Sequence, residues 1–297
     1  MTTFASDLKI QDKLHIPNNV TFGVEIEFEN ASFKNIEQKM DRSKLGGLLS
    51  NGWILKQDGS LSKYKDTIGM GGELTSPILH NTVEDYKEIK EACRIIQECH
   101  GLATENCGGH IHIGSKIFGY NKTYYIRLMK LWLVYENEIV RFSMGENEVL
   151  RPLIDKYAKT NAYIFSHIDS LKDEKLCDIF ENLGSDKDLA LSLRNLRKYA
   201  EYHTLEVRCP AGTINPDIWE NNINFFVNFL LACKDDSKDW DKIDRLYEET
   251  IKEKKLFHIL DYNFEKAVEL SDFIFDKTID KFNFLVQYKK DSKVLIR

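Results

Sequence analysis

The sequence predicts an α+β protein built around a largely antiparallel sheet. Three observations support this fold class. Short segments alternate apolar and polar residues with the period of a strand, and longer segments have the amphipathic spacing of a helix. The two kinds are scattered along the chain, with hairpin-like pairs among the strands.

The first third of the chain supplies three extended segments. "FGVEIEFE" (22–29) alternates throughout and predicts the first strand. "NGWILKQDGSLS" (51–62) predicts two short strands joined by a turn at Asp58 and Gly59. "GMGGELTSPIL" (69–79) predicts another extended segment, and its glycines at 69, 71 and 72 predict a flexible turn before Glu73.

A helix, a strand and a second helix follow. Thr82 predicts the cap of a helix with apolar residues at helical spacing, and Gly101 predicts its end. The glycine-flanked "GGHIHIG" (108–114) predicts a strand. "YYIRLMKLWLVYENEIVRFS" (124–143) predicts a long amphipathic helix.

The remainder is more varied. Residues 150–200 are lysine-rich and predict short pieces of helix. "HTLEVRCPAGT" (203–213) predicts a strand that ends in a loop. Asn215 and Pro216 then suit the cap and first turn of a helix that runs to about residue 233.

Length and composition are those of a globular protein with a substantial core. The chain has 297 residues, of which 42% are hydrophobic and 30% are charged. The acidic "KDDSKD" (234–239) is the one plausible boundary. We therefore expect a main domain over residues 1–234 and a charged helical extension over residues 235–297 that packs on it.

Charge and cysteine usage disfavour several classes of protein. A net charge of -6 argues against non-specific binding to nucleic acid or anionic membranes. The N-terminus lacks the apolar core of a signal peptide, and the longest apolar run, "FFVNFLLAC" (225–233), is too short to span a bilayer. The six cysteines form no C-x-x-C pair, which favours core thiols in a reducing compartment. We expect a cytoplasmic protein.

Three predicted strands each gather polar groups on one face, because side chains at i and i+2 share a face about 7 Å apart. If these strands share a sheet, their polar faces form a floor that offers carboxylates and imidazoles to Mg²⁺ or Mn²⁺ and a guanidinium to an anion. Taken singly, each strand also fits a solvated face or a cross-strand ion pair. The three sets are Glu25, Glu27 and Glu29, then His110 and His112, then Thr204, Glu206 and Arg208.

The common nucleotide and zinc motifs are absent. The sequence has no G-x-x-x-x-G-K-[ST] loop, no G-x-G-x-x-G, no H-E-x-x-H and no zinc-type cysteine spacing. A nucleotide would therefore be held by a sheet and its metals.

In this order, "FGVEIEFE", "DGSL", "GGELTSPIL", "GGHIHIG" and "TLEVRCPAGT" resemble the amidoligase family. Its members are carboxylate–amine ligases with the catalytic fold of glutamine synthetase and γ-glutamylcysteine synthetase. The resemblance spans roughly residues 20–232. It implies a curved antiparallel sheet with helices packed on one face, as in the catalytic domain of glutamine synthetase. The concave face would bind ATP with Mg²⁺ or Mn²⁺.

The resemblance also implies roles for single residues. Arg208 would neutralise the transferring phosphoryl group and, with His110 and His112, contact the nucleotide. Glu73 or Asp58 would accept a proton from the amine, and Glu29 would end the strand or support the metal ligands. Lys156, together with Arg151 and Lys198, is a candidate contact for the nucleotide phosphates or the substrate, against the alternative of a lysine-rich helical face. The implied metal ligands are Glu25, Glu27, Glu73, His110 and Glu206.

The implied reaction joins a small-molecule or peptide carboxylate to an amine through an acyl phosphate. Two alternatives stay open at this point, a guanidino phosphotransferase of the same fold and a metal-binding module without turnover. Relatives of this fold often assemble, so the resemblance is compatible with a homo-oligomer. The sequence does not identify the acid or the amine.

Overall fold

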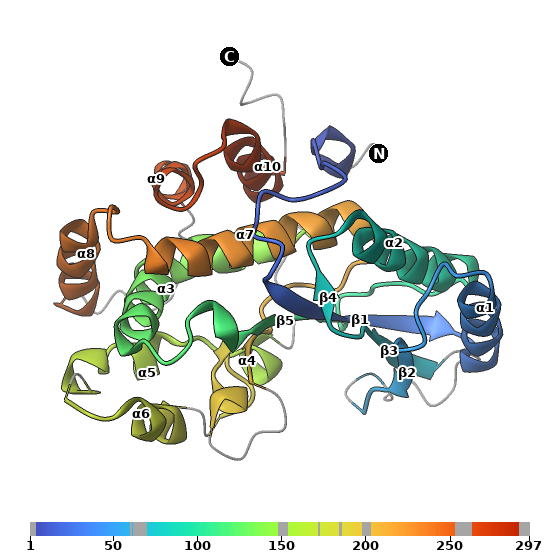
Figure 1. Cartoon of the computed structure of the whole chain (residues 1–297), viewed down its shortest axis with the longest axis horizontal. Helices are drawn as coiled ribbons and strands as arrows, with labels where there is room; N and C mark the ends of the chain where they lie inside the picture. Colours follow the sequence, from blue (N-terminus) through green and yellow to red (C-terminus); the bar gives the residue numbers. More distant parts are fainter. Residues whose placement is uncertain are drawn as a thin grey trace.

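The computed structural model describes residues 4–59, 61, 70–147, 154–171, 173–183, 186–197, 203–252 and 263–290 (Figure 1). Within these residues the chain forms an open antiparallel sheet of seven strands in the order β2-β3-β1-β5-β7-β6, with β4 paired to one end of β1. This confirms the α+β prediction. The strands are β1 (Thr21–Ala31), β2 (Ile54–Gln57), β3 (Met70–Thr75), β4 (Leu79–His80), β5 (Gly109–Gly114), β6 (Leu191–Ser192) and β7 (Thr204–Val207).

The predicted helices occur in the predicted order within the described ranges, and a helix over Phe33–Leu45, which the sequence did not predict, adds to them. Residues 150–200 form short pieces of helix, as expected, together with the short strand β6. The α-helices are α1 (Phe33–Leu45), α2 (Val83–Glu98), α3 (Lys122–Ser143), α4 (Ile154–Tyr157), α5 (Ala162–Phe165), α6 (Leu176–Leu183), α7 (Pro216–Lys234), α8 (Trp240–Lys252), α9 (Phe264–Ile274) and α10 (Thr278–Lys289). Short 3-10 helices include η1 (Phe4–Asp7) and η3 (Ile168–Leu171).

Helices α2, α3 and α7 cover the apolar face of the sheet. Phe22 of β1 stacks on Tyr86 of α2 with ring centroids 6.0 Å apart. Gly109 of β5 lies so close to Trp219 of α7 that a Cβ there would sit 2.7 Å from the indole ring. The apolar side chains of β5 and β7 pack against α3 and α7, which lie side by side behind the sheet (Figure 1). The opposite, polar face therefore carries the predicted floor.

The predicted caps of α2 and α7 are present. The Thr82 hydroxyl accepts the backbone N–H of Asp85 at 3.1 Å, and the Asn215 side chain accepts that of Asp217 at 3.0 Å. Each bond satisfies a donor that the first turn of a helix leaves unpaired. Helix α2 ends at Glu98, and His100 rather than Gly101 takes the left-handed conformation, with φ 62°.

The glycines before Glu73 do not form the predicted turn. Gly71 and Gly72 lie inside β3, which pairs with both β1 and β2. A Cβ on Gly71 would lie 2.3 Å from the Leu61 side chain, so the residue is small because another part of the chain crosses it. Gly69 lies outside the described residues.

The second strand predicted within 51–62 falls mostly outside the described residues. The partner of β2 that the structure shows is β3, with Lys56 opposite Glu73. The turn expected at Asp58 and Gly59 is where β2 ends. This pairing brings the Asp58 end of β2 next to the Glu73 region of β3.

Gly72→Ala should destabilise the protein by about 1–3 kcal/mol, in the range of overpacked cores. The new Cβ would lie 2.4 Å from the Phe33 ring, which can move, and 2.7 Å from the Lys56 carbonyl oxygen, which belongs to the sheet and cannot. Urea unfolding would measure the shift in midpoint. Gly59→Ala is the control, because a Cβ there meets nothing within 4 Å. Equal midpoints for the two variants would contradict this account of β3.

The C-terminal helices pack on α3 and α7 (Figure 1). The buried Lys130 of α3 forms an ion pair with Asp244 of α8 at 2.7 Å. The Asn221 side chain of α7 donates to Gln287 of α10 at 2.8 Å. The N-terminal helix η1 lies beside α10 and joins it in a small apolar cluster. A domain boundary at residue 235 stays a prediction.

Buried Glu220 of α7 should make stability fall as pH rises. Its carboxylate lies 3.3 Å from the Lys90 ammonium, and burial raises its pKa from the ordinary 4.5 to about 7. Between these two values the folded protein holds a proton that the unfolded chain has released. The free energy of unfolding therefore decreases across this window, by about 3 kcal/mol at most from this group.

Urea unfolding of Glu220→Gln at pH 5 and pH 8 would test this. We expect the variant to lose less stability than the wild type between the two values. Glu249→Gln, which changes an exposed carboxyl on α8, should keep the wild-type difference. A Glu220→Gln protein with an unaltered pH dependence would contradict the assignment.

The six cysteines are free thiols, and five of them are buried, as core thiols should be. Cys177 departs from that expectation because it is exposed. None of the helices in the described ranges is both long and apolar enough to cross a membrane.

Candidate functional site

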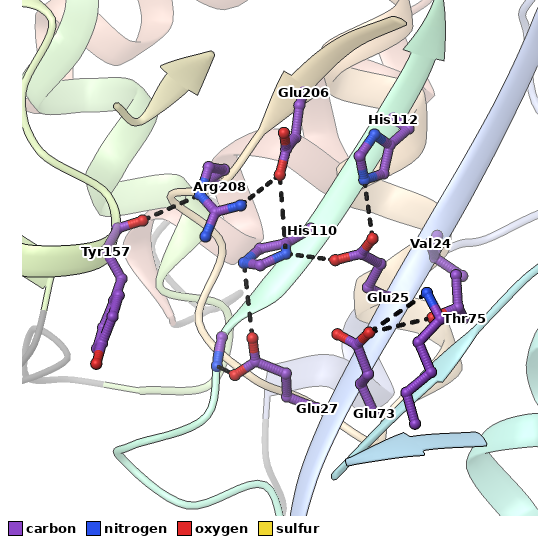
Figure 2. A network of polar contacts seen from close by, with 12 residues as sticks. Val24, Glu25, Glu27, Glu73, Thr75, His110, His112, Tyr157, Glu206 and Arg208 are labelled. Atoms are coloured by element: carbon purple, nitrogen blue, oxygen red, sulfur yellow. Dashed lines mark hydrogen bonds and ion pairs between the residues drawn. The ribbon is translucent and has the colours of Figure 1, made fainter. Parts of the chain in front are cut away.

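Four neighbouring strands bring the predicted polar groups together on the face opposite α2, α3 and α7 (Figure 2). The register sets Glu25 opposite His110, Glu27 opposite Glu73, and His112 opposite Glu206. The polar faces of the three sequence segments therefore do share one sheet. We call the set the polar floor; it comprises Glu25, Glu27, Asp58, Glu73, His110, His112, Glu206 and Arg208.

His110 lies at the centre of the polar floor and is only 6% exposed (Figure 2). Its Nδ1 lies 2.6 Å from Glu25 Oε2 and 4.0 Å from Glu206 Oε1. Its Nε2 lies 3.6 Å from Glu27 Oε1. One imidazole thus stands among three carboxylates that come from two different strands.

Hydrogen bonds to both histidines keep Glu25 ionised. Burial by itself would raise the pKa of Glu25, but the bonds from His110 and His112 and their charges lower it well below its usual range. His112 Nε2 lies 3.1 Å from Glu25 Oε1. Burial would lower the pKa of His112, but the hydrogen bond to Glu25 and the charge of Glu206 raise it. This pair of shifted pKa values favours a negative Glu25 beside a positive His112.

A second group of carboxylates converges at the β2–β3 side of the floor. Glu27, Asp58 and Glu73 each offer an oxygen atom, and these atoms all lie within 4.8 Å of one another. Glu27 is 4% exposed and accepts the backbone N–H of Gly108. Burial and the charge of Glu25 raise the pKa of Glu73. Three acids this close repel one another unless a proton or a cation joins them.

Arg208 lies just beyond β7 and is fixed at the edge of the floor by three bonds. Its guanidinium donates to Glu206 Oε1, and its Nε donates to the Tyr157 carbonyl at 3.1 Å. Its backbone N–H donates to the Ala190 carbonyl at 2.8 Å. A positive charge is therefore held in place where the acidic floor ends.

Two predicted residues lie apart from these contacts. Glu29 accepts the Thr104 hydroxyl at 2.6 Å and pairs through its backbone with Leu102, so it anchors the loop before β5. Lys156 is exposed on α4, with its ammonium 4.7 Å from the centroid of the Tyr157 ring. Arg151 and Lys198 lie outside the described residues.

The structure adds groups that the sequence analysis missed. The Lys56 ammonium lies 3.7 Å from Glu73 Oε1, and the Thr75 hydroxyl lies 3.4 Å from the same oxygen. The i, i+2 spacing of Lys56 and Asp58 could have indicated that both side chains share a face. The Tyr157 carbonyl and the Gly108 N–H are backbone groups, so no residue type points to them.

Comparison with known proteins identifies a family. The model of the family described as "Putative amidoligase enzyme" matches residues 18–230, which include every residue of the polar floor. No curated protein matches the sequence. The match covers most of the chain and supports an enzyme with a ligase-type function. The chain belongs to the amidoligase family.

Proposed function

We propose that the protein is an ATP-dependent ligase that uses Mg²⁺ or Mn²⁺ to join a carboxylate to an amine. One observation carries the proposal: a chain of the amidoligase family gathers five buried or half-buried acids, two histidines and an arginine on one face of a sheet. The substrates would be ATP, a small-molecule or peptide carboxylate, and an amine.

The residues present fit divalent metals. Hard cations prefer carboxylate oxygens, and imidazole is a further ligand for Mn²⁺. Glu27, Asp58 and Glu73 would form one metal site, because their oxygens already converge. Glu25, His110 and Glu206 would form a second one. Bound metals would supply charge neutralisation at the phosphoryl oxygens and relieve the repulsion within the floor.

The reaction needs activation because a carboxylate is a poor electrophile. A carboxylate oxygen of the acid would attack the γ-phosphorus of ATP, the bond to ADP would break, and an acyl phosphate would form. Arg208 would stabilise the negative charge on the transferring group. The amine nitrogen would then attack the acyl carbon, and phosphate would leave. A carboxylate oxygen of Glu73 or Asp58 that does not bind metal would accept the amine proton.

Added Mn²⁺ or Mg²⁺ should raise the melting temperature, because metals that bind the folded state stabilise it by mass action. Glu73→Gln should weaken this response at least about tenfold in apparent metal affinity. Differential scanning fluorimetry across a metal titration, reversed with EDTA, measures both. Glu105→Gln, an exposed acid in the loop before β5, is the control. A Glu73→Gln protein with the wild-type response would remove that acid from the metal site.

Product analysis tests the chemistry. The protein is incubated with ATP, Mg²⁺ and pools of amino acids and amines, and ADP, phosphate and amide are followed. Phosphate release that requires both an acid and an amine supports ligation. A phosphoguanidine without free phosphate would replace the ligase by a guanidino phosphotransferase. Metal-dependent stability with no turnover in any pool would indicate a binding module.

A further inference from the structure

Glu136 is a buried carboxylate in α3, outside the polar floor. It is 3% exposed, and burial raises its pKa although hydrogen-bond donors surround it. Its Oε1 accepts the Trp132 indole N–H at 3.0 Å and the Asn161 backbone N–H at 2.6 Å. Its Oε2 accepts the Thr160 hydroxyl at 2.6 Å. Burying a carboxyl group costs free energy, and the three hydrogen bonds offset part of that cost.

The segment that Glu136 holds, residues 157–161, runs alongside the β6 region. The Asn161 side chain donates to the Leu191 carbonyl and accepts the Leu191 N–H, both at 2.8 Å. Lys159 pairs through its backbone with Asp188 and Ala190, at 2.6 and 2.7 Å. Residues 159–161 are thus bonded to α3 on one side and to residues 188–191, which lead into β6, on the other.

Arg208 is bonded both to residues 157–161 and to the segment that leads into β6. The Tyr157 carbonyl, at the start of the segment, accepts Arg208 Nε. The Ala190 carbonyl accepts the Arg208 backbone N–H, and β6 pairs with β7 so that Ser192 lies opposite Glu206. The guanidinium is therefore oriented by a carbonyl whose position depends on the 157–161 segment.

We infer that Glu136 is a positioning residue: it fixes residues 157–161 so that the Tyr157 carbonyl holds the Arg208 guanidinium at the edge of the polar floor. The hydrogen bonds described above support this effect of Glu136 on the orientation of Arg208. The consequence for rate rests on the proposed function, in which Arg208 meets the transferring phosphoryl group.

The geometric part can be tested without any turnover. The Arg208 Nε–H signal is assigned by ¹⁵N NMR from its loss in Arg208→Lys, and its exchange with solvent is measured. We expect Glu136→Leu, which removes every acceptor, to speed this exchange about tenfold or more. Glu136→Gln keeps one carbonyl oxygen for Trp132 and Asn161 and should restore most of the protection.

Glu138→Leu is the matched control. Glu138 is another buried carboxyl of α3, with its pKa raised by burial to about 7, and Lys266 and Asn263 rather than residues 157–161 are its neighbours. It should leave the Arg208 exchange at the wild-type rate. If Glu136→Leu fails to fold, Thr160→Val removes one of the three bonds and should give a smaller change of the same sign. Wild-type exchange in the folded Glu136 or Thr160 variant would overturn the inference.

A double-mutant cycle tests the consequence for rate. Glu136→Leu should lower kcat about 10- to 100-fold in the wild-type background and hardly at all in the Arg208→Ala background. Losses that multiply would show that Glu136 acts independently of Arg208 and would overturn the inference. A wild-type protein with no turnover would count against the proposed function, and the exchange measurement would still decide the role of Glu136.

Discussion

Glu27→Gln should lower kcat about 1,000-fold or more while the fold stays intact. Glu27 stands where the two proposed metal sites meet: it belongs to the group with Asp58 and Glu73, and its Oε1 lies 3.6 Å from His110 Nε2. The amide of Gln can still accept the Gly108 N–H. Its uncharged NH₂ group would then face the polar floor in place of the carboxylate oxygen that would bind the metal.

The stability of this variant should hardly fall, because one negative charge leaves a crowded acidic group. Steady-state turnover and thermal unfolding, measured side by side, separate the two effects. Glu29→Gln is the matched control: the same substitution on the same strand, at a residue that binds Thr104. We expect it to change kcat by less than about threefold. Wild-type turnover in Glu27→Gln would refute the proposal that the polar floor binds catalytic metals.

Arg208→Lys should lower kcat about 100- to 1,000-fold although the positive charge is kept. The guanidinium bonds Glu206 and the Tyr157 carbonyl at once, and an ammonium on a flexible stem cannot reproduce that fork. Because the interaction is needed mainly as charge develops on the phosphoryl group, KM for the acid and the amine should change little.

The measurement is a full set of kcat and KM values for each substrate of Arg208→Lys. Arg197→Lys serves as control, since the half-buried Arg197 donates through its Nε to the Arg194 carbonyl, three residues earlier in the chain. A large rise in KM with kcat unchanged would mean that Arg208 binds ground-state substrate rather than the transferring group. The proposed role would then be wrong.

Much of the sheet could be predicted because alternation is a local signal. The segment 22–29 shows one residue type on each face, and β1 buries its apolar set against the helices. The glycines of β3 could not be predicted in the same way. Gly71 and Gly72 are tolerated in a strand because Leu61 and Phe33 cross it, and those contacts come from distant parts of the chain.

In the site, too, local sequence patterns could be predicted and contacts from distant parts of the chain could not. Strand period placed Glu25, Glu27, His110 and Glu206 on one face, and the register of β1, β3, β5 and β7 then brought them together. The bond from Arg208 to the Tyr157 carbonyl could not be foreseen, because that carbonyl is a backbone group on a short helix. The charge of Lys156 suggests a phosphate contact; its ammonium lies 4.7 Å from the centroid of the neighbouring Tyr157 ring, and the phosphate contact stays a prediction.

The contact between the first and last described segments bears on how the chain is made. The Lys9 N–H donates to the Asn283 side chain at 2.8 Å across a sequence separation of 274 residues, and His15 lies 3.0 Å from Asp280. On the ribosome, Lys9 and His15 emerge long before α10 has been synthesised, so their bonds to α10 can form only at the end of synthesis. The residues of the polar floor all leave the tunnel before that partner does, so the sheet can assemble first and the two ends can dock last.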